Sequence, residues 1–158
     1  MFDWIVPDTY AEPADLTAWM GAEQDNAVAL LRAASGLVQK ATKLALYATD
    51  TSTGLPTDPN ILKAMKEATC IQAAAWVKLG VDPDLGGVLV ASVKKSKKIG
   101  TASVELADAD AAAAARAAAL TDLVPAAYEK LRSQNLISHF PSREYGYGNT
   151  PGIWPNLI

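Results

Sequence analysis

Apolar residues recur at helical spacing along most of the chain. The longest such run extends from about Gln24 to Tyr47 and keeps an i, i+3, i+4, i+7 spacing for about five turns. Arg32 and Lys40 fall on the opposite face. This pattern predicts a long amphipathic helix that packs one face on a core and leaves the other in solvent.

A shorter helix is predicted before it, over Pro13–Met20. Proline suits the first position of a helix, and Gly21 follows as a stop signal. Leu16, Trp19 and Met20 stand at i, i+3 and i+4, so we expect them to share one apolar face.

A further long helix is predicted over residues 59–79. Asp58 is placed as its N-cap, Pro59 occupies the first position, and Gly80 ends it. The stretch Cys70–Val77 is apolar nearly all round. A helix without a polar face is buried on several sides, so this one is either central in the domain or covered by another copy.

The second half of the chain predicts smaller elements. β-prone residues near 88–106 indicate a short hairpin insertion, and an Ala-rich helix with Asp108 and Asp110 at its start follows, up to Leu120. A last helix, capped by Thr121 or Asp122, extends to about residue 134. The fold class is therefore mainly α: a small bundle of four to five helices (residues 1–137) with a hairpin and an extended C-terminal tail (residues 138–158).

Composition limits the chemistry. The 158 residues include 30 alanines but one cysteine and one histidine, which excludes a disulfide framework and a zinc site built from several of these ligands. Cys70 lies in the apolar part of its helix, where a buried hydrophobic role is expected. His139 stands alone in the tail, so no set of catalytic side chains is evident. We expect no enzyme activity, no cofactor and no metal.

Charge is distributed unevenly along a mildly acidic chain of net charge −3. Residues 1–26 hold six acids and no base, whereas four lysines occupy five consecutive positions: Lys94, Lys95, Lys97 and Lys98. Three interpretations of this lysine cluster are possible. It is a solvated hairpin tip, a contact to nucleic-acid phosphates, or a contact to the acidic segment of another copy.

The C-terminal tail combines glycine and proline with large apolar residues. These residues are Tyr145, Tyr147, Ile153, Trp154, Leu157 and Ile158. A permanently disordered segment lacks such side chains. We expect the tail to dock on a partner, with folding back on its own domain as the alternative.

The N-terminus carries an acid where a secretory signal needs bases, and no apolar run reaches the length of a membrane span. Together with the single free thiol, this predicts a protein made in the cytosol, without a membrane partner.

The order of these segments resembles a known family. A helix ending in Trp19-Met20-Gly21 precedes a long Ala/Leu helix, and Gly54-Leu55-Pro56-Thr57-Asp58-Pro59 leads into Ala68–Trp76. Later, Lys98–Val104 precedes the Ala-rich helix and Leu131–Leu136. From about Thr9 to Ile137 this set resembles the head-to-tail adaptor (connector) proteins of long-tailed bacteriophages.

The resemblance implies a structural role in the virion neck. Family members form a ring, commonly of twelve copies, between the portal and the stopper or tail-completion proteins, around the channel through which DNA passes without sequence-specific binding. Assembly takes place in the host cytoplasm. By this resemblance, the six apolar tail residues would dock on the portal, and the lysine cluster would face a neighbour, the stopper or the lumen. The alternatives are another small phage neck or tail-completion protein and a helical nucleic-acid-binding module that uses Lys94–Lys98.

Overall fold

The chain is described here from a computed structural model, which defines residues 5–85, 96–99, 102–105 and 109–137. This part of the chain is mainly helical, as predicted. Its elements are α1 (Pro13–Met20), α2 (Ala27–Ala41), α3 (Pro59–Leu79), the single-turn 3-10 helix η1 (Pro83–Leu85), β1 (Ser96–Ile99), β2 (Ala102–Glu105), α4 (Ala109–Thr121) and α5 (Pro125–Arg132).

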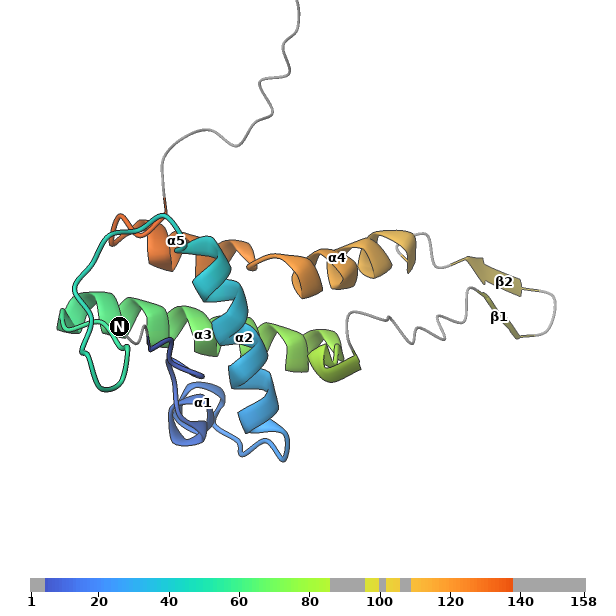
Figure 1. The fold of residues 1–158 in the computed structure, drawn as a ribbon. Helices are drawn as coiled ribbons and strands as arrows, with labels where there is room; N and C mark the ends of the chain where they lie inside the picture. Colours follow the sequence, from blue (N-terminus) through green and yellow to red (C-terminus); the bar gives the residue numbers. More distant parts are fainter. Residues whose placement is uncertain (1–4, 86–95, 100–101, 106–108, 138–158) are drawn as a thin grey trace, which may run out of the picture.

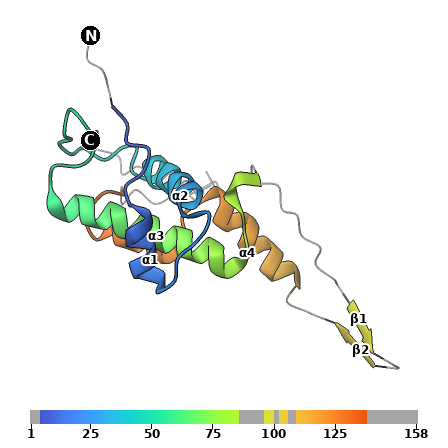
Figure 2. The ribbon, with the colours of Figure 1, turned by 90° about the horizontal axis from the view of Figure 1, so that it is seen from below.

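Helix α3 is the centre of the fold. Figures 1 and 2 show α1, α2 and the α4–α5 pair on three different sides of it, and α3 contacts each of these helices. Helices α4 and α5 together run antiparallel along α3, while α2 crosses it steeply (Figure 1). The sequence left two alternatives for the apolar second half of this helix, a central position or a face covered by another copy. In the described part of the chain it is central, because α3 contacts α1, α2, α4 and α5.

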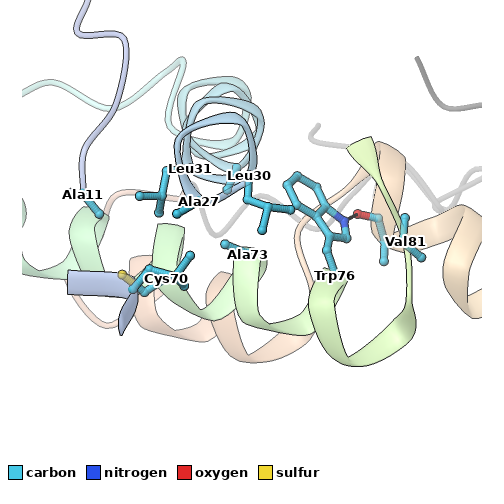
Figure 3. Packing of buried hydrophobic residues seen from close by; sticks show 11 residues of the cluster. Ala11, Ala27, Leu30, Leu31, Cys70, Ala73, Trp76 and Val81 are labelled. Atoms are coloured by element: carbon cyan, nitrogen blue, oxygen red, sulfur yellow. Dashed lines mark hydrogen bonds between the residues drawn. The ribbon is translucent and has the colours of Figure 1, made fainter. Parts of the chain in front are cut away.

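Two hydrophobic clusters hold the helices together. In the first, the buried side chains of Leu30 and Leu31 of α2 belong to one cluster with Ala73 and Trp76 of α3, and Leu30 lies beside Trp76 (Figure 3). Burial of one leucine side chain contributes about 1.5–3 kcal/mol. The second cluster joins the other half of α3 to α5 and to the end of the described chain; its buried members are Tyr10, Val38, Ala64, Met65, Ala68, Ala127, Leu131, Leu136 and Ile137.

Local capping signals explain where α1 and α3 begin and end. The side chain of Asp58 accepts hydrogen bonds from the backbone N–H groups of Asn60 and Ile61, at 2.8 and 3.4 Å. Gly21 and Gly80 end α1 and α3 in the left-handed conformation, with φ of 74° and 64°, which glycine adopts without steric cost. These three predicted boundaries are confirmed, and α1 begins at Pro13 as predicted.

Helix α2 is shorter than its apolar pattern predicts. It ends at Ala41, and the N–H of Ala45 bonds to the carbonyl of Thr42, which tightens the chain into a turn. Leu44, which continues the helical spacing, is 83% exposed. The pattern continues past the end of the helix, but of its last members only Ala45 packs against the core.

Two side chains differ from the prediction. Trp19 was predicted to share one apolar face of α1 with Leu16, but it is 48% exposed while Leu16 is fully buried. An eight-residue helix turns only one narrow stripe towards α3, and Leu16 occupies it. In α5, Val124 rather than Thr121 or Asp122 is the N-cap, without a side-chain cap. Pro125 starts that helix because its missing N–H needs no partner there.

Strands β1 and β2 pair antiparallel, with Lys97 opposite Val104 and Lys98 opposite Ser103. Most of the segment 88–106 and all of 138–158 lie outside the described residues. The hairpin insertion and the extended tail therefore stay predictions.

Candidate functional site

The predicted site residues lie mainly outside the described part of the chain. Lys94, Lys95 and the six apolar tail residues fall there, and Lys97 and Lys98 are placed on β1 by backbone register alone. The structure therefore leaves the site that these residues would form a prediction. It instead draws attention to a surface that the sequence pattern did not indicate.

This surface is a pocket of about 430 Å³ between the N-terminal arm (residues 5–12) and the segment that follows α2. We call it the arm pocket. The arm supplies Ile5, Val6 and Tyr10, and the segment after α2 supplies Leu46 and Tyr47. Most of its lining is aliphatic or aromatic, which suits an apolar side chain better than a charged ligand.

Hydrogen bonds fix the arm along α2. The backbone N–H of Tyr10 donates to the buried hydroxyl of Ser35 at 3.0 Å. The side-chain amide of Gln39 donates to the carbonyl of Pro7 at 2.8 Å. These two contacts join residues 25 and 32 positions apart, so the arm is held by tertiary structure although it has no regular secondary structure.

Gly54 holds the other wall of the pocket. Its φ is +72°, and a Cβ at this position would lie 2.2 Å from the carbonyl oxygen of Ile5. Only glycine permits this backbone conformation and this close approach together. The 50–55 turn that presents Gly54 is closed by Asp50, whose side chain accepts from the N–H groups of Ser52 and Thr53.

The floor of the pocket is buried and neutral. Tyr10 is 5% exposed. Burial is the main cause that raises the pKa of its phenol above the ordinary value; the neighbouring Tyr47 adds to this, and a hydrogen bond with Gln39 opposes it. Tyr10 therefore stays protonated at physiological pH and offers a hydroxyl, not a charge.

The rim of the pocket is unusually apolar for a surface. Of the lining residues, Leu46 is fully exposed, and Ile5 and Val6 of the arm are 43% and 54% exposed. Lys43 also lines the pocket, and Leu44, which follows it in the chain but does not line the pocket, is 83% exposed. Single exposed leucines are common on soluble proteins, but several around one pocket mark an interaction site.

A second feature, away from the pocket, fixes α4 and α5 on α3. The carbonyl of Ala119 accepts from the side-chain amide of Gln72 at 2.9 Å and from the indole N–H of Trp76 at 2.6 Å. The side-chain oxygen of Gln72 accepts from the N–H of Val124 at 2.7 Å. Arg116 donates to the carbonyl of Leu79 at 3.1 Å. The joint between α4 and α5 is thus bonded to the central helix.

Ion pairs add further links to α3. Lys66 pairs with Asp15 of α1 at 3.1 Å, and Glu67 pairs with Lys130 of α5. Burial acts to raise the pKa of Asp15, but hydrogen bonds from the backbone of Glu12 and from Lys66 outweigh it, so the pKa lies below its ordinary value. These contacts stabilise the fold and form no reactive centre.

Two observations concern reactive side chains in the part of the chain that the structure describes. Within those residues, no three His, Cys, Asp or Glu side chains gather as metal ligands would. Cys70 is buried, and this burial raises the pKa of its thiol to about 11, so it is not a thiolate nucleophile at neutral pH. Among the same residues, no helix is long and apolar enough to span a membrane.

Comparison with known proteins identifies no relative. No protein-family model matches the chain, and neither a curated protein nor a solved structure matches it.

Proposed function

We propose that this chain is a structural virion protein, a head-to-tail adaptor that forms a ring between the portal and the stopper or tail-completion proteins of a long-tailed bacteriophage. The observation that carries the proposal is the ordered set of segments from Thr9 to Ile137, which resembles that family and falls on α1–α5 of a helical domain. An apolar surface pocket, rather than a reactive centre, is the main surface feature of the described domain, which fits a protein that works by contact.

Ring assembly requires each copy to bury surface against two neighbours in a head-to-tail manner. Helix α4 offers one suitable face, because its alanines at 111, 112, 114, 115, 117 and 118 are exposed. A 13-residue helix gains little stability from its own hydrogen bonds in water. Contact with a neighbouring copy would stabilise it.

Two parts of the proposal concern segments that lie largely or wholly outside the described residues. We propose that residues 88–106 form a hairpin insertion that carries the lysine cluster to a neighbour, the stopper or the DNA channel. We also propose that the tail, residues 138–158, is extended and docks on the portal through its six large apolar side chains. DNA would pass the ring without sequence-specific binding, which suits a mildly acidic protein.

The direct test is to image the purified protein and to measure its native mass, alone and with the portal protein encoded by the same genome. A closed ring, or a complex with the portal, is the expected result. Truncation after Ser138 should leave the helical domain folded, because every described residue is retained, and should abolish portal binding. Monomers that never bind a portal, together with virions that lack the protein, would refute the proposal.

If the protein purifies with a tail protein instead of the portal, it is another neck or tail-completion component. This outcome would keep the structural class and change the position in the virion.

The second candidate is a helical nucleic-acid-binding module. The observation in its favour is the cluster of four lysines in five positions, two of which lie on β1. Replacing Lys94, Lys95, Lys97 and Lys98 by alanine would then lower DNA affinity and reduce the steepness of its salt dependence. An adaptor would bind DNA weakly, and its ring formation would be the property to measure in this variant.

A further inference from the structure

The arm pocket has an open rim of apolar side chains, and its occupant can be inferred from where the described chain ends. Ile137, the last described residue, is 7% exposed and belongs to the same buried cluster as Tyr10 of the pocket floor. Ala45 and Tyr47, which line the pocket, pack against that cluster. The chain therefore leaves its core beside the wall of the pocket.

The segment that follows is long enough and apolar enough to fill it. Residues 138–158 are 21 residues, which span up to about 70 Å when extended. They include four large aromatic or aliphatic residues in their last six positions (Ile153, Trp154, Leu157 and Ile158) and two tyrosines before them. A short tether beside the pocket gives this segment an effective concentration in the millimolar range, so even a weak contact is well populated.

We infer that the arm pocket binds the chain's own C-terminal segment, which places large apolar side chains between the N-terminal arm and Leu46. This contact is intramolecular and does not depend on the proposed function. If the segment also docks on a larger partner, that partner must displace it from the pocket, and the apolar residues are covered until then. Binding in the pocket would keep the apolar side chains of the C-terminal segment from associating with other molecules before the partner is bound.

The first test compares backbone hydrogen exchange in the full chain and in the chain truncated after Ser138. We expect truncation to increase exchange several-fold in residues 42–49, which line the pocket, and to leave residues 68–76 at the centre of α3 unchanged. Unchanged exchange in residues 42–49 would overturn the inference. An increase seen instead on deletion of residues 1–4 would also overturn it, because the N-terminal residues would then be the occupant.

The second test is oxidative cross-linking of Leu46→Cys combined with Trp154→Cys. A matched control combines Trp154→Cys with Val28→Cys, because Val28 is 54% exposed near the start of α2 and lies about 20 Å from the end of that helix, next to which the pocket begins. Cys70 is buried and stays out of the reaction. An intramolecular cross-link at position 46, with little or none at position 28, is the expected result.

Cross-linked dimers at position 46 would overturn the intramolecular contact and assign the pocket to the segment of a second copy. Equal cross-linking at positions 46 and 28 would show that the C-terminal segment does not bind the arm pocket. Neither result bears on portal binding, which the native-mass experiment measures separately, so failure of this inference and failure of the proposed function are distinguishable.

Discussion

The carbonyl shared by Gln72 and Trp76 gives a quantitative test of how α4 and α5 are held. Replacing Gln72 with leucine keeps the side-chain volume but removes the amide that donates to the Ala119 carbonyl and the oxygen that accepts from Val124. The Val124 N–H is then left without its partner, which costs about 1–3 kcal/mol. Trp76→Phe removes the second donor to Ala119, and we expect a loss of about 1–2 kcal/mol from that bond and the smaller ring.

The double variant distinguishes a shared acceptor from two independent contacts. In either single variant the Ala119 carbonyl retains one donor, whereas in the double variant this buried group has none. The combined loss should therefore exceed the sum of the single losses by about 1 kcal/mol or more. Urea unfolding followed by helical circular dichroism measures these free energies without relying on tryptophan fluorescence.

Thr69→Val is the matched control in the same helix. Thr69 is fully buried, but its hydroxyl donates to a carbonyl of Met65 that lies within α3 and is already bonded by the helix. Thr69→Val should lower the free energy of unfolding by less than about 1 kcal/mol, and its effect should be additive with that of Trp76→Phe. Additive losses for Gln72→Leu and Trp76→Phe, within about 0.5 kcal/mol, would show that the shared-carbonyl reasoning is wrong.

Three further predictions follow from the described contacts. Gly54→Ala should lower the free energy of unfolding by more than about 1 kcal/mol, because φ at Gly54 is positive and the new Cβ would meet the Ile5 carbonyl. The control Gly36→Ala, in open space within α2, should raise the free energy of unfolding by about 0.5–1 kcal/mol. Equal effects of the two variants in urea titrations would refute the role given to Gly54. Asp15 has a pKa below its ordinary value in the folded state, so its contribution to stability is present above about pH 4 and is lost as the pH falls. In the Asp15→Asn variant, the free energy of unfolding should therefore decrease less between pH 5 and pH 2 than in the wild-type protein. An equal decrease in both proteins would contradict this prediction. The Cys70 thiol has a pKa of about 11, and the residue is 2% exposed. It should therefore react with a disulfide reagent at pH 8 only after denaturation. Rapid reaction of the native protein would contradict its burial.

The pocket was not predictable from the sequence, for a clear physical reason. Its walls come from residues 5–10, from the end of α2 and from Gly54, and no periodic pattern connects positions so far apart. One signal was present: Leu44-Ala45-Leu46-Tyr47 is an apolar run that continues past Thr42. Helical spacing placed Leu44 and Ala45 on the apolar face of a longer helix.

What the sequence determined by itself was the helical character of the chain and the boundaries set by local bonds. Pro13 and Gly21 bound α1, and Asp58 and Gly80 bound α3, through contacts within a few residues of each cap. Such contacts form whatever the rest of the chain does, so the residue types encode them directly.

What only the tertiary structure decided was which apolar side chains found a partner. Leu16 and Trp19 stand on the same predicted face, yet Leu16 is fully buried and Trp19 is 48% exposed. Leu44 fits the spacing of α2, yet the helix ends before it. Periodicity specifies a face of a helix, but burial requires an opposing surface, and that surface is supplied by residues tens of positions away in the chain.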